Sequence, residues 1–163
     1  MKINIFNKDT LIIDEFKFKC SIGKRGFVKN KVEGDKKTPL GTYKLGKLYY
    51  RKDRVLKPET SIPTRVIKRN YGWCNDPKSK FYNKEYILNK KICGEKLYRK
   101  DYKYNYFIEI KYNSKKIIPG KGSAIFLHLT KNYKKTLGCI ALKKKDMIIL
   151  LKLINNKTKI KIC

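Results

Sequence analysis

The only histidine in the chain, His128, precedes a cysteine, Cys139, by eleven positions in the stretch GSAIFLHLTKNYKKTLGCIAL. A thiol beside an imidazole suits nucleophilic catalysis, because thiolate is the reactive form and the imidazole takes the thiol proton. Gly138 allows a tight backbone turn before the cysteine, so that main-chain N–H groups could point at an oxyanion. The two residues are therefore candidates for an acyl-transfer site.

Other interpretations fit the same two residues. A histidine on an apolar strand is often a hydrogen-bonded core residue, and a cysteine after glycine is often a small hydrophobe. A serine nucleophile that uses His128 is disfavoured, since no serine lies in a G-x-S-x-G turn. A zinc site is weaker still, because one histidine and five scattered cysteines without a C-x-x-C pair do not supply four ligands.

Two apolar runs must position this pair. Ser123–Leu129 is almost continuously apolar, which predicts a strand buried on both faces, and Ile140–Leu142 is a second short run. Tyr133–Lys135 forms a polar return between them. We expect a hairpin that brings the imidazole and the thiol face to face.

The rest of the chain predicts many short strands and one clear helix. The strands are expected at Lys2–Phe6, Leu11–Ile13, Phe16–Ser21, Thr42–Tyr50, Thr64–Lys68, Tyr104–Tyr112 and Lys157–Ile162. Apolar residues at helical spacing predict a helix from Lys144 to about Ile154. Tyr71–Asn83 is expected to be a long surface loop that carries recognition residues, and part of Lys84–Tyr98 to be helical. The expected fold is a single, mainly β domain over residues 1–163, a β-sandwich or partly closed barrel, with the helix directly after the nucleophile motif.

The formal charge of +29 would by itself suggest a nucleic acid or another polyanion as partner. The excess is nearly all lysine and is spread over every segment, which is more typical of solvated faces. A non-catalytic basic module that binds nucleic acid or another polyanion remains the alternative hypothesis. It leaves unexplained why the only histidine lies so close to a Gly-Cys turn.

The five cysteines are an odd number at unpatterned spacings and do not predict a disulfide framework: Cys20, Cys74, Cys93, Cys139 and Cys163. If the compartment is oxidising, Cys139 is the thiol expected to stay free. The first residues lack an apolar stretch of signal-peptide length, and Ile148–Ile154 is too short to cross a membrane. No signal peptide and no transmembrane segment are therefore expected.

Three blocks resemble the L,D-transpeptidase (YkuD-like) catalytic domain family, in family order. SAIFLHL…TLGCIAL resembles its histidine and [Ser/Thr]-x-Gly-Cys motifs. Glu33–Tyr43 resembles its G-D-x-x-T-P-x-G-x-[YF] segment, and Gly72–Pro77 with the following Tyr82 and Asn83 resembles its G-W-C-[DN]-D-P…YN segment. The chain departs from the family at Leu137, where many members carry histidine, and at Ala141, where an arginine is frequent.

This resemblance implies a β-rich fold and a cysteine acyltransferase of peptidoglycan, active in cell-wall organisation and cell shape, with neither metal nor organic cofactor. It implies a thioester on Cys139, with His128 as the base, passed to an amine or to water in transpeptidation or L,D-carboxypeptidase chemistry. Thr136, Leu137 and Gly138 would support the oxyanion turn. The residues implied for substrate binding are Tyr43, Trp73, Asp76, Tyr82 and Asn83. The resemblance implies peptidoglycan stem peptides as the partner and no specific nucleic acid. It implies the cell envelope or periplasm as the location, although without a visible signal peptide a cytoplasmic location stays open.

Overall fold

The computed structural model describes residues 1–89 and 94–163. This part of the chain forms one helix, α1 (Lys144–Leu153), and a series of short strands. The strands are β1 (Lys2–Phe6), β2 (Thr10–Ile13), β3 (Phe16–Ser21), β4 (Phe27–Val28), β5 (Thr38–Pro39), β6 (Gly41–Tyr50), β7 (Thr64–Val66), β8 (Tyr71–Cys74), β9 (Glu85–Ile87), β10 (Gly94–Lys96), β11 (Tyr106–Ile110), β12 (Phe126–Leu129), β13 (Ile140–Leu142) and β14 (Lys159–Ile162).

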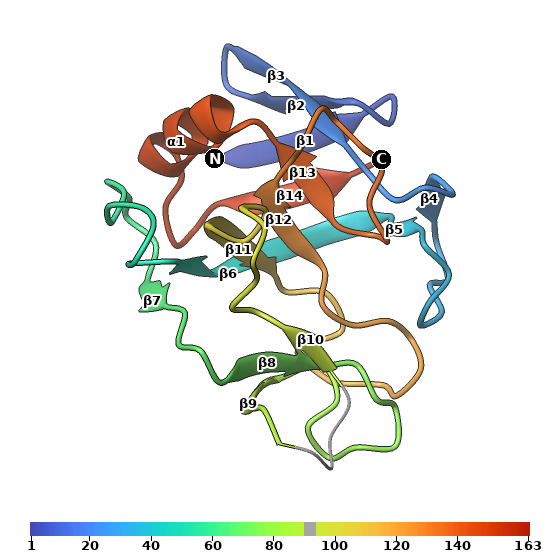
Figure 1. The fold of residues 1–163 in the computed structure, drawn as a ribbon. Helices are drawn as coiled ribbons and strands as arrows, with labels where there is room; N and C mark the ends of the chain where they lie inside the picture. Colours follow the sequence, from blue (N-terminus) through green and yellow to red (C-terminus); the bar gives the residue numbers. More distant parts are fainter. Residues whose placement is uncertain (90–93) are drawn as a thin grey trace.

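The main sheet curves into a barrel. Its strands follow the order β11-β12-β13-β3-β2-β1-β14-β6-β7, and β6 also pairs with β11, which makes a partly closed barrel of eight strands. Figure 1 shows α1 on one side of this barrel and a small three-stranded sheet, in the order β10-β8-β9, on the opposite side. The prediction of a mainly β fold with one helix after the cysteine is confirmed.

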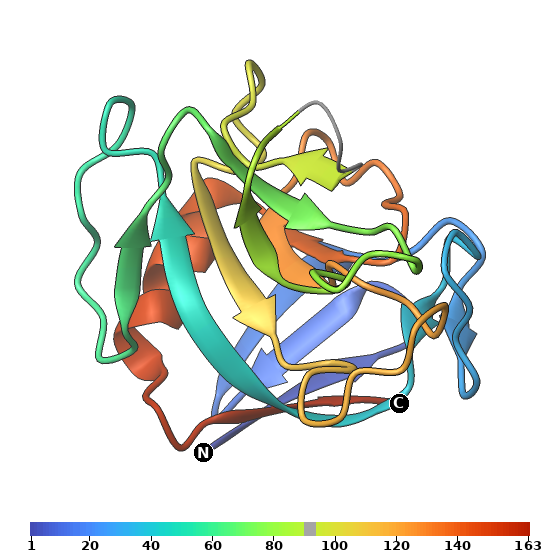
Figure 2. The same cartoon turned by 90° about the horizontal axis from the view of Figure 1, so that it is seen from below.

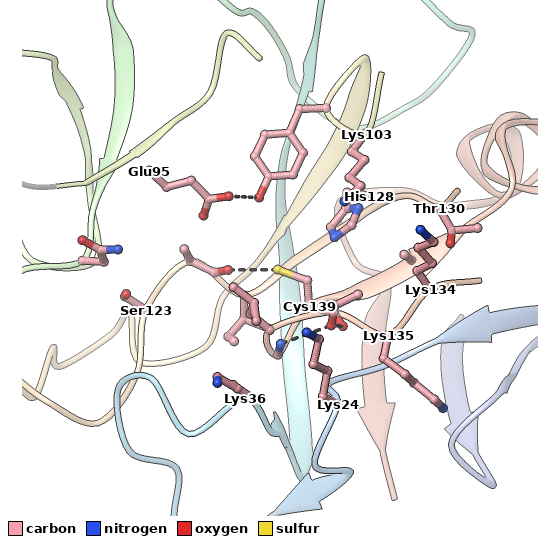
Figure 3. A pocket seen from close by; sticks show the side chains of 18 of the residues that line it. Lys24, Lys36, Glu95, Lys103, Ser123, His128, Thr130, Lys134, Lys135 and Cys139 are labelled. Carbon is pink, nitrogen blue, oxygen red and sulfur yellow. Dashed lines mark hydrogen bonds between the residues drawn. The ribbon is translucent and has the colours of Figure 1, made fainter. Parts of the chain in front are cut away.

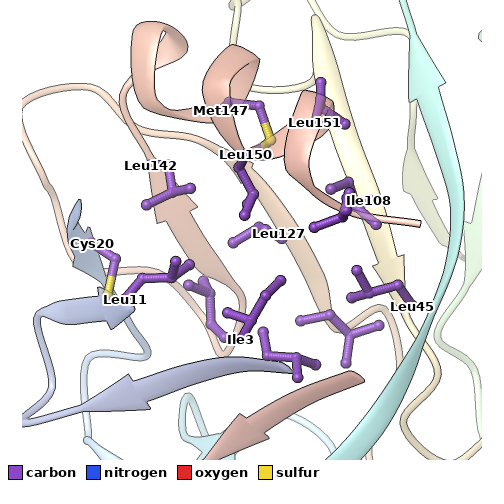
Figure 4. Packing of buried hydrophobic residues seen from close by; sticks show 14 of the residues in the cluster. Ile3, Leu11, Cys20, Leu45, Ile108, Leu127, Leu142, Met147, Leu150 and Leu151 are labelled. Carbon is purple, nitrogen blue, oxygen red and sulfur yellow. The ribbon is translucent and has the colours of Figure 1, made fainter. Parts of the chain in front are cut away.

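Alternating apolar residues fill the barrel. In β1 the side chains of Ile3 and Ile5 are fully buried while their neighbours face outward, as the period of two in a strand requires. The helix closes this core by burying Met147, Leu150 and Leu151, one apolar face of α1 (Figure 4). Figure 2 shows the same arrangement from below, with β6 and β11 running side by side across the barrel.

The segment Tyr71–Asn83, expected to be a long surface loop, is a loop only from residue 75 onward. Its first four residues form β8, a buried strand that pairs with both β9 and β10. Trp73 is 4% exposed and packs edge-on against Phe126 with ring centroids 5.0 Å apart. Burial of aromatic surface against the barrel therefore outweighs the polar, turn-rich composition of the segment. The expected helix in Lys84–Tyr98 was wrong for the described residues of that range, which form β9 and β10; Cys93 lies outside the described residues.

The expected hairpin between the two apolar runs was also wrong. Strands β12 and β13 are neighbours but run parallel, with His128 opposite Ala141 and Leu127 opposite Ile140. The connection from Thr130 to Cys139 must therefore loop back to the start of β12, and it does so past Gly23, which bridges to Thr136. Parallel pairing needs such a crossover, whereas two antiparallel strands need only a short turn. The cysteine is consequently placed beside the beginning of β12 and not opposite its end.

Candidate active site

A rigid turn carries Cys139 to the start of β13. Gly138 has φ of +140°, and a side chain there would come within 2.9 Å of the Lys37 carbonyl oxygen, so glycine is required. Thr136 Oγ1 accepts the Gly138 N–H at 3.1 Å and donates to the Cys139 carbonyl at 2.6 Å. The three residues predicted to support the oxyanion turn, Thr136, Leu137 and Gly138, thus form this turn. Leu137 lies at the tip of the turn and is 67% exposed.

Thr38 fixes the peptide group between Gly138 and Cys139. Its hydroxyl is fully buried, accepts the Gly23 N–H at 2.9 Å and donates to the Gly138 carbonyl at 2.8 Å. The C=O and N–H of a trans peptide point in opposite directions, so this bond turns the Cys139 N–H away from Thr38. Sequence reasoning did not single out Thr38, although it lies within the Glu33–Tyr43 block, which was recognised.

The imidazole of His128 is held in one tautomer. Its Nδ1 lies 2.9 Å from the Leu129 carbonyl oxygen, which can only accept a hydrogen bond. The proton is therefore assigned to Nδ1, and the Nε2 lone pair remains available as a base. Tyr104 packs edge-on against the ring with centroids 5.4 Å apart. Figure 3 shows the ring of His128 turned toward the side of the cavity that holds the Cys139 sulfur.

Burial keeps both groups neutral. It raises the pKa of the Cys139 thiol to about 12, to which the negative charge of Glu95 contributes, while the Phe126 N–H donates to Sγ at 3.4 Å and opposes the rise. The Cys139 thiol donates to the Ala124 carbonyl at 3.2 Å (Figure 3). Burial lowers the pKa of His128 to about 4, against the hydrogen bond to Leu129, and the positive charge of Lys103 lowers it further. The resting pair is a thiol beside a neutral imidazole and not an ion pair.

Asn83 and Trp73 lie behind the nucleophile. Asn83 Oδ1 accepts hydrogen bonds from Trp73 Nε1 at 3.0 Å and from the Ala124 N–H at 3.1 Å, while its Nδ2 donates to the carbonyls of Tyr112 and Asn113. This network positions Ala124, which has a φ of +51° and accepts the thiol hydrogen bond. Asn83, held by Trp73, thus supports Ala124, which contacts Cys139 directly.

The remaining residues predicted for substrate binding lie further out. The hydroxyl of Tyr82 donates a hydrogen bond to Glu33, which also accepts one from Ser123. Glu33 and Ser123 line the cavity, whereas Tyr82 does not. Asp76 accepts the Lys78 N–H at 3.0 Å in an Asx turn, and Tyr43 donates to the Leu40 carbonyl. None of the three is among the described residues that line the cavity.

The cavity around Cys139 and His128 has a volume of about 710 Å3. Among its described lining residues, eight are cationic and two, Glu33 and Glu95, are acidic. Ala141 also lines it. Several lining side chains were not predicted. Glu95, Arg99 and Lys103 come from segments distant in the chain, Asn75 lies within the recognised Gly72–Pro77 block, and Thr130 follows His128 by two residues.

The fold and the site define a class: a small β-barrel domain with a half-buried cysteine and a buried histidine in one basic cleft. Residues 3–162 match the family described as YkuD, L,D-transpeptidase catalytic domain. The chain therefore belongs to the L,D-transpeptidase catalytic domain family, as the three sequence blocks predicted. No curated protein matches the sequence.

Cys20, Cys74, Cys139 and Cys163 are free thiols, so the four cysteines of the described residues form no disulfide. In the described part of the chain no helix is long and apolar enough to cross a membrane.

Proposed function

We propose that the protein is a cysteine-dependent L,D-transpeptidase acting on peptidoglycan stem peptides in the cell envelope, and that residues 1–163 form its one catalytic domain. The observation that carries this proposal is the placement of His128 in β12 and of Cys139 directly before the neighbouring strand β13, at one cavity. Membership in the transpeptidase family supports the reaction type. The basic lining supports an acidic substrate, since the stem peptide carries free carboxylates.

The first half-reaction forms a thioester. Cys139 Sγ attacks the carbonyl carbon on the L-side of an L,D peptide bond, while the thiol proton moves to Nε2 of His128. The carbonyl oxygen takes up the negative charge. We assign the Cys139 N–H as its donor, because the Gly138 N–H is already bound to Thr136 and the Thr38 contact fixes the Cys139 peptide group. Collapse breaks the C–N bond, and His128 returns the proton to the leaving amine.

The second half-reaction resolves the thioester. An amine of another stem gives a cross-link, whereas water gives L,D-carboxypeptidase chemistry. In either case His128 removes a proton from the attacking group, and Cys139 leaves as the thiol. Both outcomes use the same residues.

Mass analysis of the products formed from purified muropeptides tests the proposal. Cys139→Ser and His128→Ala should each abolish turnover and leave a folded protein, whereas Cys163→Ser, which alters an exposed free thiol, should retain activity. A carbapenem should add its mass to Cys139, because it presents a strained acyl donor to the same nucleophile. Turnover by Cys139→Ser at the wild-type rate would refute the nucleophile assignment.

A non-catalytic polyanion module is the alternative, favoured by the charge of +29. It predicts retention on DNA that falls steeply with salt, with no change after Cys139→Ser. Product formation that depends on both Cys139 and His128 excludes it as the sole function.

A further inference from the structure

The two acidic residues among the described lining of the cavity, Glu33 and Glu95, lie on one side of the thiol. Figure 3 shows Glu95 and Ser123 on one side of Cys139, and Thr130, Lys134 and Lys135 on the other side, beyond His128. Glu95 already has a partner, because it accepts from Tyr104. The basic end therefore differs in its chemistry from the end that holds the carboxylates.

Thr130 is a buried hydroxyl without a partner. It is 7% exposed, lines the cavity, and its Oγ1 has no hydrogen-bond partner among the described residues. Both backbone polar groups of Thr130 are hydrogen-bonded, since its N–H donates to the Leu142 carbonyl at 2.7 Å and its carbonyl accepts from the Tyr102 hydroxyl at 3.4 Å. A buried hydroxyl without a hydrogen bond is costly, so an acceptor supplied by a ligand would bind there favourably.

The lysines around Thr130 are not neutralised by ion pairs within the described part of the chain. Lys103, Lys131 and Lys134 line the cavity, Lys103 and Lys134 on the His128 side of Cys139 (Figure 3), and none of the three forms an ion pair with any described residue. In contrast, Lys31 in the same cavity is paired with Asp35 at 2.5 Å. A hydroxyl donor beside unpaired ammonium groups is suited to a carboxylate, which accepts hydrogen bonds from both.

We propose that Thr130, with Lys103 and Lys134, forms a carboxylate subsite for the terminal carboxylate of the amino acid that the acyl donor releases. This proposal rests on the proposed function. His128 must reach the leaving amine to return its proton, so the leaving group lies on the imidazole side of the thiol. Thr130 follows His128 by two residues and therefore continues the same face of the extended chain. The leaving amino acid can then place its amine at the imidazole and its carboxylate at Thr130.

The test compares two acyl-donor peptides that differ only in a terminal carboxylate or carboxamide. We expect wild-type kcat/KM to favour the carboxylate by about tenfold or more, as for loss of a charge-assisted hydrogen bond. Thr130→Val and Lys134→Gln should each move this ratio toward one, while Thr130→Ser retains it. Lys17→Gln is the matched control, because Lys17 is exposed on β3 and does not line the cavity.

A binding measurement separates this proposal from the proposed function. In Cys139→Ser protein, which cannot form a thioester, calorimetry should show tighter binding of the carboxylate donor, and Thr130→Val in that background should remove the preference. Equal binding of both donors overturns the subsite even if the enzyme is active. Carboxylate-selective binding without turnover of either donor by the wild type supports the subsite and refutes the transpeptidase assignment.

Discussion

The protonation state of His128 gives the sharpest test of the site, because this is the only histidine in the chain. A thiolate–imidazolium pair would raise the pKa of the imidazole above its ordinary value of 6.5. Burial among apolar and aromatic side chains does the opposite and lowers it to about 4. The two possibilities therefore predict opposite shifts of one titration, which proton NMR resolves without assignment of other residues.

The same shift makes stability depend on pH. Below 6.5 the unfolded chain binds a proton at His128 that the folded protein excludes until about pH 4. The contribution of His128 to the free energy of unfolding is therefore fully present above pH 6.5 and is lost as the pH falls toward 4. The span of about 2.5 pH units at about 1.4 kcal/mol each corresponds to about 3.5 kcal/mol in total, of which about 3 kcal/mol is lost by pH 4, where the folded protein is half protonated at His128.

Urea unfolding from pH 4 to 7.5 measures this loss. His128→Gln is the comparison, since glutamine is uncharged throughout and the carboxylates titrate in both proteins. We expect the wild type to lose about 3 kcal/mol more than His128→Gln over this range. A histidine pKa at or above 6.5, or parallel stability curves for the two proteins, would refute the neutral-pair interpretation.

Two further substitutions test the supporting residues. Thr38→Val leaves the buried Gly138 carbonyl and Gly23 N–H without partners, so we expect turnover to fall by about one to two decades, while Thr38→Ser keeps most of it. Alkylation of Cys139 by iodoacetamide needs no oxyanion donor, so its rate should change little in Thr38→Val. An equal fall in the alkylation rate would contradict the orienting role of Thr38. Asp76→Ala removes an Asx turn, so we expect a lower melting temperature with unchanged turnover, and the reverse result would assign Asp76 to substrate binding.

The local features of the fold could be predicted from the sequence because they depend on neighbouring residues. Strands β1 and β3 occupy the predicted ranges, since their apolar residues alternate along the chain. The helix begins at Lys144 as predicted, and its apolar spacing is readable without any partner. The histidine and cysteine were recognisable as a possible pair by their chemistry.

Long-range features could not be predicted in the same way. The direction of β13 relative to β12 depends on the path of the crossover past Gly23, which no local pattern encodes. The contact of Thr38 with Gly138 joins residues 100 positions apart. Thr130 carries no signal of its own, because a threonine after an apolar strand is ordinary until the lysines around it are known.

The neutral pair and the basic cleft serve the same reaction at different steps. Burial, assisted by the positive charges of Lys103 and Arg99, keeps the imidazole of His128 unprotonated, so it is available as a base at neutral pH. Once protonated, an imidazolium with a pKa near 4 is a strong acid and transfers its proton readily to the leaving amine. The positive charges of Lys31 and Arg99 lower the pKa of the Cys139 thiol and so favour the negative charge that develops on sulfur. They interact more favourably with this developing charge than with the neutral thiol, and such a differential interaction accelerates a reaction.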